Sequence, residues 1–376
     1  MKHPLSKIDK TNWDFSVKFS FFLLNATRAE ELPQRPKPGK NYEYWPDGAI
    51  TAEGTPTYGL IRLGSREDLM ISFCGGGVSI DEYTAAHPGK LGGGEPNFYA
   101  TEPFASDLLM HFGTNGRSKK NPFRDWSILL LPYTTGDFHC GRNDYPYSDM
   151  NGDSAILHHH GYENTRLLLQ KIKELVPSPK RLIITGFSAG AFGTSLLADD
   201  IMNYFPDCRD VTVIVDSAIM RHDWQPVARD VWKTPEEICA RLTGSEIVSD
   251  SLIALHHNRP EAKIMFCCSK RDFALTQWTG FLEENGNWKP TKETGDRFQE
   301  HLREMIARLQ KEIPDIGIFI FNTPNKDFEK EELTTHCICG SGAAFTVSED
   351  GITVARWMEL GVEGKLLQLG LENLNQ

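Results

Sequence analysis

Arg181-Leu-Ile-Ile-Thr-Gly186-Phe-Ser188-Ala-Gly190 is the most informative segment of this 376-residue sequence. Its first half is a short apolar run of the kind that forms a buried strand, and the small-residue segment Ala191–Asn203 that follows predicts a helix. A Gly-x-Ser-x-Gly sequence stands between the two. Glycine is needed on both sides of the serine, because the turn is so tight that side chains there would clash with the neighbouring strand and helix.

Such a turn exposes the serine hydroxyl at the start of a helix, where the helix dipole favours developing negative charge. We therefore predict that Ser188 is a nucleophile. The alternative is a glycine-rich turn that carries a serine with no chemical role. The strand before the turn and the helix after it favour the nucleophile.

Apolar strands alternate with helices along most of the chain. The expected strands are Tyr58–Leu63, Leu69–Phe73, Trp126–Pro132, Arg181–Thr185, Val211–Val215, Ala262–Cys268 and Ile316–Phe321, and the further helices are Tyr162–Val176, Arg297–Ile313 and Ile352–Leu360. This alternation implies a mostly parallel sheet with helices on both faces. The first two strands, joined through Gly64-Ser65, suggest a hairpin and an antiparallel edge. With the serine turn, the pattern predicts the α/β-hydrolase fold.

We expect one domain over residues 1–376. Residues 218–260 have no strand pattern and predict a small helical insertion or cap within that domain. Residues 30–50 are rich in proline, glycine and charge, and predict a surface loop. The alternating apolar residues of Phe15–Leu23 predict a half-buried strand.

Composition excludes several classes of partner. A formal net charge of −11 argues against nucleic acid, which needs a broad basic surface. No apolar run reaches the length of a bilayer span, so we expect no membrane. Phe19–Leu24 is too short for a secretory signal and is preceded by Asp9 and Asp14, so a cytoplasmic location is expected. Nothing in the sequence indicates an oligomeric state.

Metal ions and cofactors are not expected. Cys337-Ile-Cys339 lacks the usual two-residue spacer of a zinc site, and no second ligand pair matches it. The eight cysteines are interpreted as small buried apolar side chains, and nothing in the sequence decides whether any of them pair. His158, His159 and His160 precede the nucleophile and are typical of a polar surface.

Three glycines follow the strand Leu69–Phe73, in Cys74-Gly75-Gly76-Gly77. Acyl transfer needs backbone N–H groups aimed at the developing oxyanion, and side chains would block that approach. The expected donors are Gly76 or Gly77, together with Ala189 after the nucleophile. A phosphate-binding loop and a plain flexible turn are the alternatives, but no Gly-Lys-Ser/Thr accompanies the run.

A triad on this fold follows the chain order Ser, then Asp or Glu, then His. His336 lies after the last predicted strand and before the closing helix, so it is the expected base. Asp272 follows the strand Ala262–Cys268, whereas Asp216 ends the strand before it. Position alone leaves both carboxylates open as the acid.

These segments together resemble the pectin acetylesterase and Notum-type carboxylesterase family, especially its bacterial members, from about residue 69 to 363. The similar motifs are Gly75–Gly77, Asn121–Trp126, Pro132–Asp137, His160–Asn164, Gly186–Gly190 with Asp199, Val215–Ser217, Asp272 with Gln277 and Trp278, and Thr335–Cys337. The resemblance implies a triad of Ser188, Asp272 and His336. It also implies an oxyanion hole near Gly76 and Ala189. Val78 and Thr134 depart from the family pattern.

The resemblance implies a serine carboxylic-ester hydrolase that forms an acyl-enzyme intermediate. Its expected substrate is a carbohydrate or another small molecule that carries an acetyl ester. One alternative is a lipid-type acyl ester or amide hydrolase with the same triad, and another is a catalytically silent binding protein on this scaffold. The candidate substrate contacts are Phe187, Gln277 and Trp278, with Trp224 and Trp232 as further candidates. The alternative for each of these residues is a place in the core.

Overall fold

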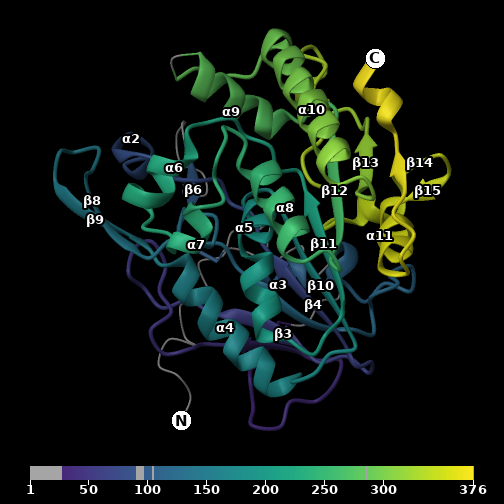
Figure 1. Ribbon diagram of the computed structural model, residues 1–376. Helices are drawn as coiled ribbons and strands as arrows, with labels where there is room; N and C mark the ends of the chain where they lie inside the picture. Colours follow the sequence, from purple (N-terminus) through teal and green to yellow (C-terminus); the bar gives the residue numbers. More distant parts are fainter. Residues whose placement is uncertain (1–27, 90–96, 104–105, 285, 376) are drawn as a thin grey trace.

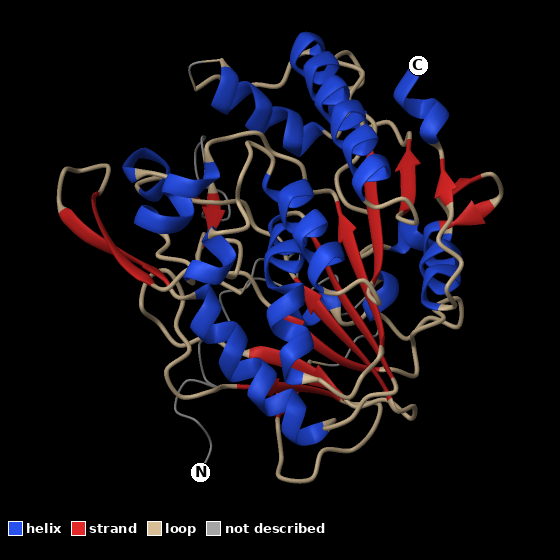
Figure 2. Ribbon diagram, in the orientation of Figure 1, coloured by secondary structure: helices blue, strands red, loops and turns tan. Residues whose placement is uncertain are grey.

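The computed structural model describes residues 28–89, 97–103, 106–284 and 286–375. Its centre is a ten-stranded sheet with the strand order β1-β2-β3-β7-β4-β10-β11-β12-β13-β16 (Figures 1 and 2). The strands are β1 Glu30–Glu31, β2 Asn41–Tyr44, β3 Gly59–Arg62, β4 Asp68–Phe73, β7 Ser127–Leu131, β10 Arg181–Phe187, β11 Asp210–Asp216, β12 Lys263–Ser269, β13 Gly317–Phe321 and β16 Gln368–Leu369.

All neighbouring strands from β7 to β16 are parallel, whereas β3 runs antiparallel to both β2 and β7. Every residue of β4, β7 and β13 is buried. Strands that are covered on both faces must be apolar along their whole length, which explains the continuous apolar runs in the sequence. The predicted α/β class with a mostly parallel sheet is confirmed.

Helices cover the sheet on both faces. They are α4 Gly161–Leu175, α5 Ala189–Tyr204, α8 Ile247–Asn258, α9 Phe273–Glu283, α10 Lys292–Glu312 and α11 Val354–Val362. Neighbours in the row α4, α5, α8, α10 contact one another, and α11 packs against β11, β12 and β13 (Figure 1). The buried Trp357 fixes α11, because its ring lies 5.5 Å from that of Phe319 and its indole N–H donates to the Leu367 carbonyl at 2.9 Å.

The shorter elements lie in the connections. They are α2 Glu82–Ala85, α3 Ser106–Leu109, β5 Pro88–Gly89, β6 Tyr99–Ala100, β8 Asn143–Ser148, β9 Ser154–His159, β14 Ser348–Glu349 and β15 Ile352–Thr353. Strands β8 and β9 form a hairpin that projects from the body of the molecule (Figures 1 and 2). Among the described residues, every helix is too short or too polar to span a bilayer.

The predicted pairing of the first two strands is wrong. Strand β7 lies between β3 and β4, so these two do not form a hairpin. A Cβ atom on Gly64 would collide with the backbone of Asp125 and Trp126. Glycine is therefore needed at this position because the chain passes close to the backbone just before β7, and not because it forms a tight turn between paired strands. The antiparallel edge exists, but it is formed by β2 and β3.

The predicted surface loop over residues 30–50 is also wrong in part, because the segment contains β1 and β2. Tyr42 and Glu43 are buried where β2 pairs with β3. Proline and glycine mark the turns around this short strand and concealed it in the sequence. The strand predicted over Phe15–Leu23 lies outside the described residues.

The segment 218–260 joins β11 to β12. It carries α6 Trp224–Pro226, a π-helical turn Val227–Val231, α7 Glu236–Cys239 and α8. Trp224 and Trp232 are fully buried in the core, and their indole N–H groups donate to the carbonyls of Met220 at 2.9 Å and Ser79 at 2.7 Å.

Candidate active site

The residues predicted from the sequence gather at one edge of the sheet. Because β4, β10, β12 and β13 are parallel, the loops that follow them open on the same side, where ligands bind in sheets of this kind. These loops carry Gly75–Gly77, Ser188, Asp272 and His336 respectively.

Ser188 occupies a strained turn between β10 and α5. Its φ of 55° and ψ of −132° lie in a region that non-glycine residues rarely adopt. Its N–H donates to the Asp216 carbonyl at 3.0 Å, and its own carbonyl accepts from Ala191 at 2.8 Å. A Cβ atom on Gly190 would collide with the Phe73 carbonyl, so the sequence needs glycine there for strand and helix to approach.

The glycine run after β4 passes directly against Ser188. A Cβ atom on Gly75 would lie 2.5 Å from the Ser188 Cβ and 2.7 Å from the Phe187 carbonyl oxygen. In the part of the chain that the structure describes, no group accepts a hydrogen bond from the amides of Gly76 or Gly77. Ala189 is the first residue of α5, where amides have no partner within the helix. These amides are free to bind an oxyanion.

His336 is hydrogen-bonded to Asp272, with 2.8 Å between the imidazole Nδ1 and the carboxylate Oδ2. Asp272 is fully buried, and its Oδ1 caps α9 by accepting from the amides of Ala274 and Leu275, each at 3.1 Å. Thr334, two residues before His336, is tied to the same loop, because its carbonyl accepts from the Phe273 amide at 3.0 Å. The carboxylate and the imidazole are thus held in a fixed relation.

The charges around His336 favour its protonated form. Burial disfavours the imidazolium. The negative charge of Asp272, the hydrogen bond that the imidazole donates to it and the charge of Asp216 outweigh that penalty, so the pKa of His336 is raised above its ordinary value.

Asp216, the other candidate for the acid of the triad, is hydrogen-bonded to groups other than the His336 imidazole. Its Oδ2 accepts from the amides of Ile338 at 2.9 Å and Cys339 at 2.7 Å, and its Oδ1 accepts from the Ser217 hydroxyl at 3.0 Å. Burial raises the pKa of this carboxyl despite those bonds. Asp216 therefore fixes the loop after His336, whereas Asp272 contacts the imidazole.

Ser188 and His336 line one cavity of about 530 Å³. Among the described residues no hydrogen bond links the two side chains, a bond that is often long until substrate binds. The other lining residues are Gly75, Gly76, Gly77, Gly89, Asn97, Phe98, Tyr99, Ala100, Phe138, Phe187, Ala189, Phe192, Met220, Ala274, Leu275, Gln277, Trp278, Trp288 and Cys337. Phe187, Gln277 and Trp278 were predicted from the sequence, whereas Trp224 and Trp232 lie elsewhere.

Most of the aromatic residues that line this cavity were not predicted from the sequence. The ring of Phe98 lies 5.5 Å from Trp278 and 4.9 Å from Trp288, and these residues come from separate segments. No periodic pattern marks Phe98 or Trp288 as cavity residues. Phe192 had a usable signal, because it stands four residues after Ser188 and so lies on the same side of α5.

The three consecutive histidines do not share one environment. His159 is fully buried, contrary to the expected polar surface, because strand alternation turns it toward the core, where its Nδ1 lies 2.8 Å from the Thr135 carbonyl oxygen. His158 and His160 remain at the surface with about a quarter of each side chain exposed. All eight cysteines are unpaired, and all but the half-buried Cys337 are fully buried.

Two crystal forms of the Wnt deacylase Notum from Drosophila are similar to this structure. Their TM-scores are 0.60 and 0.59, at 14% sequence identity over 87% of this chain and 95% of each Notum chain. The chain shares their fold. No family model and no curated protein sequence matches the chain. The similarity confirms the expected α/β-hydrolase fold, while membership of the resembled family and of its bacterial branch stays a prediction.

Proposed function

We propose that this protein is a serine ester hydrolase with Ser188 as nucleophile, His336 as general base and Asp272 as the orienting acid. The observation that carries the proposal is the hydrogen bond between His336 and a buried Asp272, at a cavity that Ser188 also lines. A serine, an imidazole and a carboxylate arranged in this order are the parts of acyl transfer. The fold shared with a deacylase supports the same activity.

The reaction starts when the Ser188 hydroxyl attacks the ester carbonyl and His336 takes its proton. The amides of Gly76 or Gly77 and of Ala189 hold the oxyanion of the tetrahedral intermediate. His336 then gives its proton to the departing alcohol, which leaves an acyl group on Ser188. Water repeats the attack on that acyl group, and the free acid is released. Each step uses side chains and amides of this chain.

Two kinds of acyl group are candidates for the substrate. An acetyl ester of a carbohydrate or small alcohol is the first candidate, on the family resemblance. A longer acyl chain is the second candidate, and the cavity favours it. The cavity volume of about 530 Å³ is larger than an acetyl group needs, and the aromatic walls offer apolar contacts to a longer chain.

Replacing Ser188 with alanine tests the chemistry. We expect Ser188→Ala to lose hydrolysis of p-nitrophenyl esters by at least about 10⁴-fold, as removal of a triad member does in serine proteases. A fluorophosphonate probe should label the wild type at Ser188 and leave the variant unlabelled. Unchanged turnover in the variant contradicts the triad. A wild type that neither turns over esters nor reacts with the probe favours the silent binding protein.

An ester panel tests the acyl group. If the cavity holds a longer chain, kcat/KM on p-nitrophenyl esters rises about fourfold for each methylene from acetate upward, since burying one contributes about 0.8 kcal/mol. Trp288→Ala should weaken that rise and leave acetate turnover similar. A rate that is highest for acetate and falls with chain length supports the acetyl ester instead.

A further inference from the structure

A second group of reactive side chains lies at the base of the β8–β9 hairpin. Asp144 on β8 pairs directly with His158 on β9, and His160 follows two residues later. Strand alternation places His158 and His160 on one face and sends His159 to the core. Sequence inspection missed the group because the carboxylate is 14 residues away from His158, on the partner strand.

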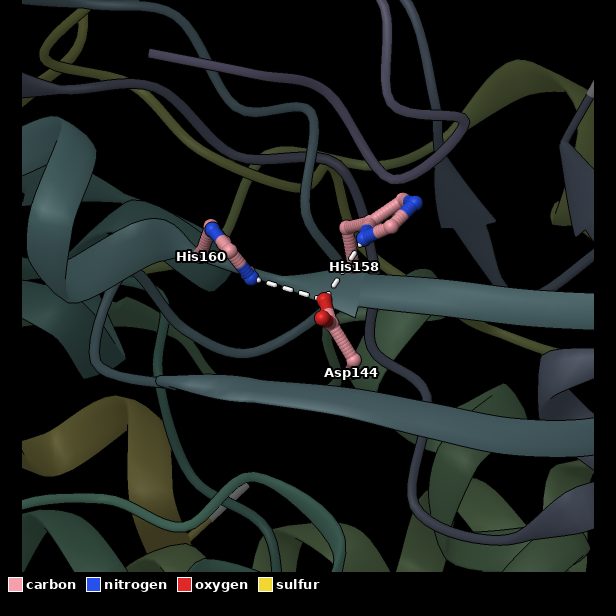
Figure 3. Close-up of side chains that lie close together, drawn as sticks. All are labelled: Asp144, His158 and His160. Carbon is pink, nitrogen blue, oxygen red and sulfur yellow. Dashed lines mark hydrogen bonds and ion pairs between the residues drawn. The ribbon is translucent and has the colours of Figure 1, made fainter. Parts of the chain in front are cut away.

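Both imidazoles converge on one carboxylate oxygen. Asp144 Oδ1 lies 2.6 Å from His158 Nδ1 and 2.9 Å from His160 Nε2, and Figure 3 shows both rings turned toward the carboxylate. The three ligand atoms all lie within 4.8 Å of one another. Tetrahedral Zn²⁺ binds imidazole nitrogen and carboxylate oxygen at about 2.0–2.2 Å, which sets such atoms roughly 3.3 Å apart. Small side-chain movements would open the group to that spacing.

The backbone around this group is well held. The His158 amide donates to the Ala52 carbonyl at 3.0 Å, and a Cβ atom on Gly54 would lie 3.1 Å from His158 Nε2, so Gly54 leaves room for the ring. Asp144 is 59% exposed, whereas the two imidazoles are about one quarter exposed. An ion therefore has an open approach, and water can complete its coordination.

We propose that Asp144, His158 and His160 bind one divalent transition-metal ion of the Zn²⁺ type. Two imidazole nitrogens and one carboxylate suit Zn²⁺, whereas Ca²⁺ and Mg²⁺ require oxygen ligands. The ion ties the hairpin to the start of α4, because His160 directly precedes that helix. None of the three residues lines the active-site cavity, so the site is separate from the proposed ester chemistry.

A competing group must be separated in the test. Asp216, Cys267 and Cys339 also lie close together, fully buried. Asp216 already accepts hydrogen bonds on both oxygens, so an ion there would have to displace them. A Cys267→Ser variant therefore distinguishes the two groups.

The test uses the full chain, free of any histidine tag and stripped of metal by a chelator. Titration with Zn²⁺ in a calorimeter should give one equivalent bound to the wild type. His158→Gln and His160→Gln should each weaken that affinity by at least about 100-fold, since loss of a partner outside the first shell already costs 10–100-fold. His257 is an exposed histidine on α8 and serves as a control. The variants His257→Gln and Cys267→Ser should bind Zn²⁺ as tightly as the wild type does.

A second readout does not depend on variants. Co²⁺ bound to the wild type should give the weak visible bands of nitrogen and oxygen ligands, without the intense near-ultraviolet band of a thiolate. Failure of the wild type to bind Zn²⁺ overturns the proposal and leaves Asp144 as a plain hydrogen-bond acceptor. Binding that survives in both histidine variants, or that is lost in Cys267→Ser, overturns it as well.

Discussion

His336 shows how one residue is tuned by burial and by two carboxylates at once. Burial lowers the pKa of His336, whereas Asp272 at 2.8 Å and the charge of Asp216 raise it by more, so the net shift is upward. A raised pKa has a direct consequence if His336 is the general base proposed above, because the imidazole must then be neutral to accept the proton from Ser188.

We therefore expect kcat/KM for ester hydrolysis to rise with pH along a limb whose midpoint lies above histidine's usual value of about 6.5. Asp272→Asn removes the attraction while burial remains, so the midpoint should fall. The rate should drop by about 10⁴-fold, the size found for the matching change in serine proteases. Rate profiles measured against pH for the wild type, Asp272→Asn and the exposed Asp230→Asn check this. A midpoint that stays in place in Asp272→Asn contradicts it.

The choice between the two acids shows where sequence reasoning stops. Asp216 ends β11 and Asp272 follows β12, so both belong to the same sheet edge and satisfy the chain order of a triad. Only the three-dimensional arrangement separates them, because the amides of Ile338 and Cys339 occupy Asp216. Those amides lie more than 120 residues further along the chain, and no local pattern encodes that contact.

Among the elements, the strand β4 and its glycine run act as one unit with the turn at Ser188. Gly75 lies directly against Ser188 because no side chain separates the two segments, and Gly76 and Gly77 line the same cavity as Ser188.

Gly75→Ala should therefore impair activity strongly. The added methyl group would lie 2.5 Å from the Ser188 Cβ, so the glycine loop or the serine must move, and a displacement of about 1 Å costs about 10²-fold in rate. Gly342→Ala is the matched control, since a Cβ atom there has nothing within 4 Å. Ester hydrolysis and thermal unfolding of both variants provide the measurement. Equal activity in Gly75→Ala and the wild type would place the glycine run away from the reacting groups.

Elements with a strong local signal were predicted well, and those without one were not. β10 and α5 match their predictions because an apolar run and a glycine-flanked serine mark both sides of the turn. The pairing of β3 with β7 depends on a crossing of the chain at Gly64, which in the sequence looks like an ordinary turn. Register between strands distant in sequence is a tertiary property, which no local sequence pattern specifies.

In the molecule as a whole, the same contrast separates the proposed catalytic groups from the cavity that they line. The former follow strand ends and carry motifs, whereas the aromatic wall joins Phe98, Trp278 and Trp288 from three separate segments. The fold could be predicted from the alternation of strands and helices. The similarity to the Notum structure shows that this fold is kept at only 14% sequence identity. The acyl specificity depends on packing between loops that share no pattern.

Packing beneath the glycine run also links the stability of the whole molecule to pH. His139 is buried against Phe73 and Tyr133, and its Nε2 lies 3.0 Å from the carbonyl oxygen of Cys74, directly before the run. Burial lowers the pKa of His139 to about 4. The unfolded chain binds a proton near pH 6.5, so the stability from the neutral imidazole is complete above that pH. It is lost as the pH falls toward 4, by about 3 kcal/mol at 1.36 kcal/mol per pH unit.

Urea unfolding at a series of pH values from 7.5 to 4 checks this expectation. The free energy of unfolding should fall through that range in the wild type, and it should fall less steeply in His139→Gln, whose amide does not titrate. The comparison concerns the slope, so any packing loss in the variant shifts the whole curve without imitating the effect. His257→Gln should keep the wild-type slope. Equal slopes in His139→Gln and the wild type would show that protonation of His139 does not set the acid limit of the fold.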